Sequence, residues 1–376
     1  MGAVKIRESA GRRHLQVMRG WPVLALLGIA HAATAADTSY FGLLRARDLS
    51  PFALLRLDMR PAHAISAEAG SWGVETNLEY QNTWALSPEV KRYLTAFAAR
   101  STLGPGDLQA IRNLPGENYL FDMEIAEFDV SVHRKLTHDW GVYAIFSGIS
   151  YDGGFLDSTI ERFHRSFGFE PFGRNGVQRN GVNVIYDLKT AQFATYSSPI
   201  RGGLLDPNFG VRYTGTPMPE HWSLTLESAV KVPVGGRRPF LSTGRADIGV
   251  QATLRHLAKK HAWHFSASAV YYDGRTSLTP TPPQVLKTFV LGYERVLTSR
   301  THLTLQGYAS ESPYTHRQTD LQELLARKYQ LSLGISHRRK HGLWSVAFTE
   351  NLENVDNTPD IGVQLSWAFS PAFAEH

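Results

Sequence analysis

Polar and apolar residues alternate with a period of two through most of the chain beyond residue 70. In 328–336, for example, Tyr329, Leu331, Leu333 and Ile335 are separated by polar or small residues. A period of two places successive side chains on opposite faces of a β-strand. The pattern therefore predicts strands with one apolar face and one polar face.

These alternating segments are long, reaching about ten residues, which is the length that crosses a bilayer as a tilted strand. Strands of soluble proteins average about 5–6 residues. We predict twelve strands, at 72–84, 118–135, 139–151, 203–214, 221–232, 245–257, 262–273, 284–297, 301–312, 327–338, 343–352 and 360–369. An even number brings both termini of the chain to one side of a membrane, so the sequence predicts an all-β, antiparallel transmembrane β-barrel.

Short and long connections alternate between the predicted strands. The five short turns are predicted on the periplasmic side and the six longer connections outside the cell. Trp residues beside the short turns fit the aromatic belt of a membrane interface. The longest connection, 152–202, contains an alternating segment at 182–198 that predicts an extra hairpin.

The first 35 residues have the features of a secretory signal peptide. Arg19 precedes the apolar run 21–30, and the sequence Ala33, Thr34, Ala35 follows it as a cleavage site. Translation can start at Met1 or at Met18. The predicted organisation is a signal peptide at 1–35, a periplasmic or lumen-plugging segment at 36–70, the barrel at 71–369 and a C-terminal tail at 370–376.

The net charge of +5 does not indicate nucleic-acid binding. Five basic residues and one acidic residue lie in 1–35, so the rest of the chain is close to neutral. A nearly neutral chain has no electrostatic basis for binding a phosphate backbone. The chain has no cysteine, which excludes a disulfide scaffold, a thiolate metal site and a thiol nucleophile.

The polar faces of the predicted strands would line the lumen of the barrel. They carry charges of both signs, which can either orient a polar solute or form a salt-bridged wall that stiffens the barrel. The predicted lumen-lining residues are Glu75, Glu79, Asp122, Glu124, Arg212, Glu227, Lys231, Arg245, Asp247, Arg255 and Lys328.

The longer connections contain apolar residues at helical spacing. Leu156, Ile160, Phe163 and Phe167 form one such stripe, and shorter stripes lie at 90–97 and 321–325. These short amphipathic helices can gather into an apolar vestibule at one mouth of the barrel. The alternative is that they cap the barrel or rest on the lipid surface.

One pair of residues is a candidate for catalysis. His264 and Ser266 share one face of a predicted strand. Some outer-membrane barrels that hydrolyse lipid use such a pair facing the lipid. Here the neighbouring Trp263 and Phe265 occupy the lipid face, so the pair points into the lumen. We predict no catalytic, metal-ligating or cofactor-binding residues and no cofactor.

Several segments resemble an uncharacterised family of Gram-negative outer-membrane β-barrel proteins, known as a domain of unknown function. The resembling segments are 48–61, 80–82, 151–157, 160–164 and 202–206, and the resemblance covers about 40–369. It implies an exported barrel and identifies no functional residue. The last predicted strand ends on Phe369, an aromatic end of the kind that barrel-insertion machinery recognises, although the tail follows it.

The sequence therefore favours a passive channel or uptake protein for a small solute that can be amphipathic, in the outer membrane of a Gram-negative bacterium. Its predicted partners are outer-membrane lipid and lipopolysaccharide, the insertion machinery and the solute. Two alternatives remain open: a barrel enzyme acting on lipid, and a structural or adhesive barrel with a plugged lumen.

Overall fold

The computed structural model describes residues 40–61, 69–168, 171–189, 191–197, 200–272, 284–340, 342–353 and 357–369. The predicted signal peptide, the tail and the side chain of Phe167 lie outside the described residues.

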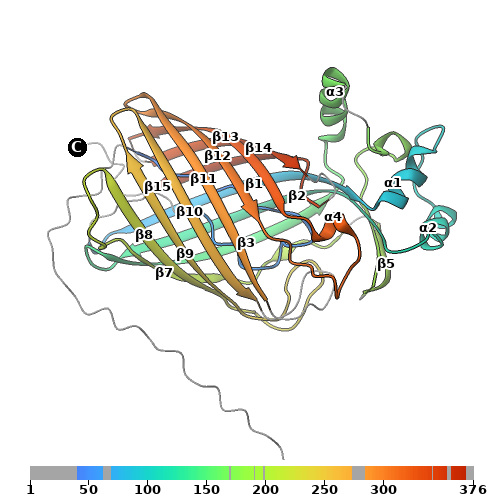
Figure 1. Ribbon diagram of the computed structural model, residues 1–376, viewed down its shortest axis with the longest axis horizontal. Helices are drawn as coiled ribbons and strands as arrows, with labels where there is room; N and C mark the ends of the chain where they lie inside the picture. The colour runs from blue at the N-terminus through green and yellow to red at the C-terminus, as the bar shows by residue number, and fades with distance from the viewer. Residues whose placement is uncertain are drawn as a thin grey trace, which may run out of the picture. The chain divides into compact units, whose positions relative to one another are not determined.

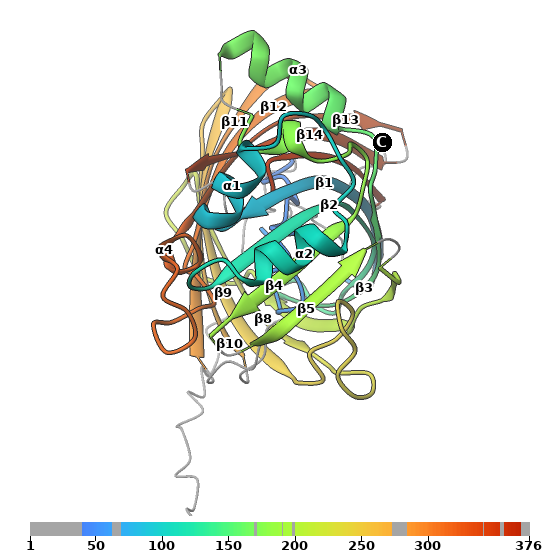
Figure 2. The ribbon, with the colours of Figure 1, turned by 90° about the vertical axis from the view of Figure 1, so that its right-hand side faces the viewer.

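Within the described residues, twelve antiparallel strands close into a ring (Figures 1 and 2). The ring closes because β1 pairs with both β2 and β15, and β2 also pairs with β3. The strands are β1 (Trp72–Leu86), β2 (Asn118–Lys135), β3 (Trp140–Asp152), β7 (Asn208–Tyr213), β8 (Trp222–Lys231), β9 (Asp247–Leu257), β10 (His261–Tyr272), β11 (Gln284–Thr298), β12 (Thr301–Ser310), β13 (Lys328–Arg339), β14 (Gly342–Glu353) and β15 (Ile361–Phe369). The predicted antiparallel barrel of twelve strands is confirmed. The predicted strand 203–214 is divided into β6 (Gly203–Leu204) and β7.

The outer face of the ring is apolar. Phe289, Leu333 and Val346 are each at least half exposed, although they are large apolar side chains. Such a continuous apolar surface requires lipid around it. Exposed Trp residues gather near the short turns, at positions 72, 140, 222, 263 and 344.

The two ends of the ring differ in their connections. We call the end with the turns after β2, β7, β9, β11 and β13 the short-turn end, and the opposite end the long-loop end. At the long-loop end β4 (Asn183–Leu188) and β5 (Ala191–Ser197) form the predicted hairpin, and β4 pairs with β2. The helical elements are α1 (Pro88–Thr95), α2 (Pro105–Arg112), α3 (Asp157–Phe167), η1 (Arg174–Gly176) and α4 (Gln322–Leu325). Among the described residues, no helix is both long and apolar enough to span a membrane.

The predicted helical stripes are packing faces rather than an open vestibule. Val90 and Leu94 of α1 are fully buried against Trp84 and Ile111, and Leu324 of α4 is buried in a separate apolar cluster. The sequence did not predict α2, because Gly104, Pro105 and Gly106 resemble a turn. In the stripe of α3, Ile160 is fully buried, whereas Leu156 and Phe163 are half-buried.

Ion pairs connect the elements of the long-loop end. Arg174 contacts Asp157 at 3.1 Å and Asp360 at 2.7 Å. Glu161 of α3 accepts hydrogen bonds from Arg100 and Arg179, each at 2.5 Å. These pairs join α3 to segments far away in the chain, so their loss should loosen the loops without unfolding the barrel.

We expect the Glu161 contacts to weaken only in acid. Burial by itself would raise the pKa of Glu161, but the hydrogen bonds and charges of Arg179 and Arg100 outweigh burial and lower its pKa below the usual 4.5. A depressed pKa stabilises the fold above the unfolded-state pKa, and this stabilisation is lost as pH falls through the folded-state value. Hydrogen exchange of α3 should therefore be constant from pH 7 to 5 and accelerate below 4, after correction for intrinsic rates. Glu161→Gln should remove this step, and an equal step in the variant would contradict the assignment.

Candidate functional site

A segment of the chain fills the lumen. Residues 40–61, which we call the plug, lie inside the ring of strands, where they are drawn in blue in Figure 2. Every plug residue except Asp58 is buried. The plug starts at the short-turn end, where the Tyr40 hydroxyl donates to the Ala258 carbonyl. It turns at 50–55 and comes back along the lumen, since Arg45 donates to the Pro61 carbonyl at 2.7 Å.

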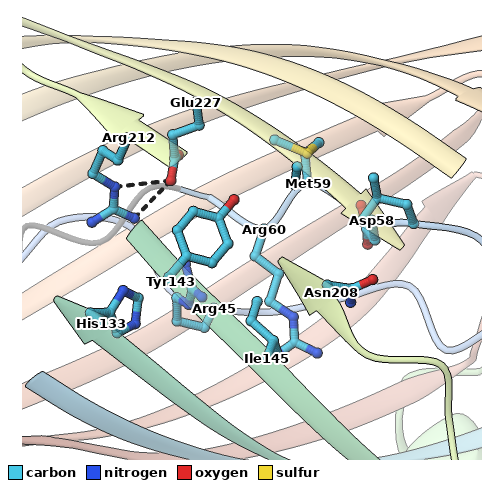
Figure 3. Close-up of a pocket in the computed structure, with 12 residues that line it drawn as sticks. Arg45, Asp58, Met59, Arg60, His133, Tyr143, Ile145, Asn208, Arg212 and Glu227 are labelled. Carbon is cyan, nitrogen blue, oxygen red and sulfur yellow. Dashed lines mark hydrogen bonds and ion pairs between the residues drawn. The ribbon is translucent and has the colours of Figure 1, made fainter. Parts of the chain in front are cut away.

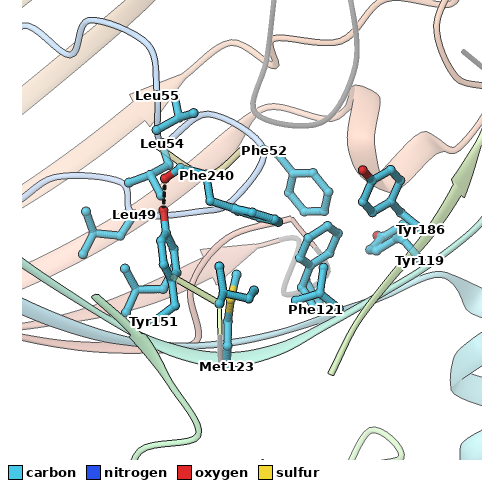
Figure 4. Packing of buried hydrophobic residues seen from close by; sticks show 14 of the residues in the cluster. Leu49, Phe52, Leu54, Leu55, Tyr119, Phe121, Met123, Tyr151, Tyr186 and Phe240 are labelled. Atoms are coloured by element: carbon cyan, nitrogen blue, oxygen red, sulfur yellow. Dashed lines mark hydrogen bonds between the residues drawn. The ribbon is translucent and has the colours of Figure 1, made fainter. Parts of the chain in front are cut away.

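The turn of the plug is held by apolar contacts (Figure 4). Phe52 packs edge-on against Tyr119 and Phe121 of β2, with ring centroids 5.4 Å and 4.9 Å apart. Phe52 is 1 % exposed. Burial of a Phe side chain contributes about 1.5–3 kcal/mol. This cluster fixes the plug at the long-loop end.

Three arginines of the plug face carboxylates of the lumen wall, and a fourth binds hydroxyl groups of the wall. Arg60 pairs with Asp129 and also contacts Glu127, at 3.4 Å. Arg47 pairs with Glu127, and Arg45 contacts Glu75 at 3.4 Å. Arg56 donates to the hydroxyls of Tyr308 and Ser310. All of these groups are buried, and buried charges are tolerated only when they are paired in this way.

Two lysines of the wall, on β8 and β13, also bind the plug. Lys231 pairs with Asp247 at 2.8 Å and donates to the Leu55 carbonyl at 2.5 Å. Lys328 pairs with Asp48 of the plug at 2.8 Å. The plug is therefore bound by both signs of charge.

A buried histidine–glutamate cluster holds the start of the plug. The carboxylate of Glu294 on β11 accepts the backbone N–H of Phe41 at 2.8 Å and that of Gly42 at 3.0 Å. The same carboxylate contacts His264 Nε2 at 3.1 Å and His302 Nδ1 at 2.5 Å. The Phe41 ring also stacks on the His302 ring, with centroids 4.0 Å apart. One carboxylate thus anchors two plug amides.

Little space remains between plug and wall. A cavity of about 10 Å³ lies between plug residues that include Arg45 and Met59 and wall residues that include Tyr143 and Glu227 (Figure 3). A second cavity of about 10 Å³ lies beside Leu54, and Asn208 lines both cavities. Each holds about one water molecule. The plug therefore obstructs the lumen where it packs on these residues.

Eight of the predicted lumen-lining residues lie on the inward face of the ring. They are Glu75, Glu79, Arg212, Glu227, Lys231, Asp247, Arg255 and Lys328. Arg212 pairs with Glu227 at 2.8 Å, and Arg255 donates to Ser223 at 3.0 Å. Several of these residues bind the plug instead of lining an open path.

Three predicted lumen-lining residues are placed elsewhere. Asp122 and Glu124 lie on the opposite face of β2, where Asp122 accepts from Asn183 and Glu124 accepts the backbone N–H of Phe155. Arg245 is exposed and precedes β9. The inward orientation predicted for Asp122 and Glu124 was wrong, because the first half of β2 lies beyond the apolar band of the barrel. There, loops cover the outer face of the strand and the apolar turn of the plug covers its inner face.

Sequence reasoning missed the wall residues Glu127, Asp129 and Glu294 and the arginines of the plug. The alternation of β2 carries a usable signal, since Phe128 and Val130 face outward and thus direct Glu127 and Asp129 inward. The four arginines within residues 45–60 are a second signal. No sequence pattern connects Glu294 with Phe41, because the barrel alone brings them together.

The candidate catalytic pair is not arranged for catalysis on lipid. His264 is 1 % exposed and contacts Glu294, whereas Ser266 shares a hydrogen bond of 2.9 Å with Thr253. Both side chains lie on the lumen face of β10. In the part of the chain that the structure describes, no group of three or more His, Asp or Glu side chains is arranged to hold a metal ion.

The apolar outer band, the polar inner wall and the closed antiparallel ring define a transmembrane β-barrel. The crystal structure of the COG4313 outer membrane channel from Pseudomonas putida F1 is similar, with a TM-score of 0.51 at 12% identity over 83% of this chain and 99% of that one. This likeness establishes the fold. The chain belongs to the DUF3187 family of proteins of unknown function, whose profile matches residues 112–370. The family resemblance noted from the sequence is thereby confirmed.

Two further solved structures are more distant. The toluene transporter TodX from P. putida has a TM-score of 0.36 at 10% identity, over 83% of this chain and 92% of that one. The translocator domain of the autotransporter NalP from Neisseria meningitidis has a TM-score of 0.41 at 8% identity, over 80% and 88%. Neither likeness is strong enough to support an argument. Among curated proteins, none matches the sequence.

Proposed function

We propose that this chain is a passive channel for a small solute in the outer membrane of a Gram-negative bacterium, with the short turns in the periplasm, and that the plug closes it. The observation that supports the proposal most is the nature of the closure. The lumen wall is polar and charged, and a separate segment of the chain obstructs it, largely through ion pairs and hydrogen bonds. Ion pairs and hydrogen bonds can be replaced by contacts with water when the segment moves, whereas the contacts of an apolar core cannot.

The comparison with the solved channel supports the same proposal. That protein is described as an outer membrane channel, and this chain covers nearly all of it. A lumen with charged walls below an apolar cluster at the long-loop end suits a solute that has both polar and apolar parts.

The second candidate is a structural barrel whose plug never leaves. The nearly complete burial of the plug favours it, because withdrawal must break the Phe52 contacts as well as the ion pairs. The two candidates differ in one measurable property, which is whether movement of the plug admits solute.

A disulfide that fixes the plug tests the proposal directly, because the chain has no cysteine of its own. A Cβ built on Gly292 of β11 would lie 3.5 Å from Leu43 Cγ in the plug, within reach of a disulfide. We expect wild-type barrels refolded from the mature chain to show discrete current steps in a planar bilayer. The variant Leu43→Cys/Gly292→Cys should be silent when oxidised and conduct again after reduction.

The two single cysteine variants are the controls, and their current should not respond to reductant. Equal current from the oxidised and the reduced double variant would mean that solute passes without movement of the plug. Silence from correctly folded wild-type and reduced barrels would reject the channel and favour the structural candidate.

A further inference from the structure

Three carboxylates of the lumen wall gather on two neighbouring strands. Glu79 of β1 lies directly opposite Glu127 of β2, and Asp129 follows Glu127 two residues along on the same face. We call these three residues the acidic stripe. Each is at most 1 % exposed. Like charges that lie opposite each other destabilise a strand pair, so the acidic stripe requires cations beside it.

The cations that neutralise the acidic stripe come from the plug. Arg47 pairs with Glu127, and Arg60 pairs with Asp129 and contacts Glu127. Among the described residues, no lysine or arginine of the barrel wall lies within ion-pair distance of the stripe, because the wall cations that form ion pairs do so with other carboxylates. Withdrawal of the plug would therefore leave the stripe without its counter-charges.

The acidic stripe also has capacity for a further cation. Glu127 Oε2 is buried and accepts no hydrogen bond from a nitrogen or hydroxyl donor of the described residues. Glu79 accepts the backbone N–H of Arg47 at 3.1 Å and the side-chain amide of Gln81 at 2.5 Å. In the described part of the chain, no cationic side chain lies within ion-pair distance of Glu79. The stripe thus offers acceptors to a guanidinium or ammonium group.

The lumen face of β2 changes from apolar to acidic along its length. Apolar residues alternate on that face from Tyr119 to Ile125, and the acidic stripe begins at Glu127, about 7 Å beyond Ile125. The plug has the same order, since Phe52 packs on the apolar part (Figure 4), whereas two of its arginines bind the stripe. The plug therefore presents an apolar group and guanidinium groups to one continuous wall, as an amphipathic cation would.

We infer that the solute of the channel is an amphipathic cation, which binds the acidic stripe through a guanidinium or ammonium group and the apolar part of β2 through its apolar body. The plug occupies the same site as an internal competitor, so closure and solute binding exclude each other. Buried ion pairs stabilise a structure no more than apolar packing does, so the charges add little to a permanent seal. They give the unplugged wall a site that is selective for cations. This inference rests on the proposed function, because it names the class of solute.

Hydrogen exchange of the plug in the full mature barrel tests this site. The probe is N-acetyl-arginyl-phenylalaninamide, which has one guanidinium group, one phenyl ring and no other charge. N-acetyl-citrullyl-phenylalaninamide is its uncharged match. At ten times its dissociation constant from the unplugged barrel, the arginyl peptide should accelerate exchange of the Leu54 amide about tenfold, because it holds the plug out of the lumen. The citrullyl peptide should leave the exchange unchanged.

The variant Glu79→Gln removes one charge of the acidic stripe without breaking an ion pair of the plug. If the arginyl peptide then binds about tenfold more weakly, the same concentration should accelerate Leu54 exchange only about twofold over the variant's own peptide-free rate. Glu227→Gln is the matched control, because it also removes one lumen carboxylate, but one that pairs with Arg212 outside the stripe. It should keep the full acceleration.

Equal exchange with the two peptides would overturn the inference, and so would an undiminished response in Glu79→Gln. Either result would leave the channel standing if the barrels conduct in the disulfide experiment. Acceleration by the arginyl peptide alone, in barrels that stay silent in a bilayer, would support the cation site and reject the channel.

Discussion

Replacing Arg60 with Met is expected to open the barrel. Arg60 is the main partner of Asp129 and a second partner of Glu127, and all three side chains are at most 5 % exposed. Removing one member of a buried ion pair leaves an uncompensated charge and costs about 3–5 kcal/mol. If withdrawal of the plug lets water reach Asp129 and Glu127, this free-energy cost destabilises the plugged state alone. The ratio of open to closed barrels should then rise by about 10²- to 4 × 10³-fold.

The measurement is the open probability of single Arg60→Met channels in a planar bilayer. Arg60→Lys keeps the charge and should stay close to wild type. Arg92→Met is a control for loss of an exposed pair, because Arg92 on α1 is 72% exposed and pairs with Glu89. Exposed pairs contribute about 0–1 kcal/mol. An unchanged open probability in folded Arg60→Met barrels would mean that the plug does not control the path.

Replacing Glu294 with Gln is expected to release the start of the plug. The carboxylate accepts two plug amides and two histidines, whereas an amide side chain has one oxygen to accept with. At least one buried donor therefore loses its acceptor, at a cost of about 1–3 kcal/mol. Hydrogen exchange of the Phe41 and Gly42 amides should accelerate about 10–100-fold.

The exchange of the Leu54 amide is the internal reference. Leu54 N–H donates to the Ser50 carbonyl within the turn of the plug, which the apolar cluster holds independently of Glu294. Its protection should stay the same in Glu294→Gln. Glu311→Gln, which changes a carboxylate just after the far end of the neighbouring strand β12, should leave both regions unchanged. If the protection of Leu54 falls together with that of Phe41, the plug moves as one cooperative unit.

The sequence by itself determined the barrel. Lipid on one side and polar groups on the other impose the period of two on each strand, so segments such as 328–336 specify both their secondary structure and their orientation. The helical spacing of Val90 and Leu94, and the alternation at 182–198, likewise located α1 and the extra hairpin. The sequence also admitted a plug, since the segment before β1 contains the short apolar run 52–57.

Only the tertiary structure decided what fills the lumen and which faces of the strands point into it. Asp122 and Glu124 follow the alternation, yet they face loops, because beyond the lipid no solvent difference separates the two faces of β2. Phe41, His264, Glu294 and His302 meet only because the ring of strands folds around the plug. The local pattern of polar and apolar residues reflects whether each face of a strand meets lipid or water. Contacts between distant segments depend instead on closure of the whole barrel.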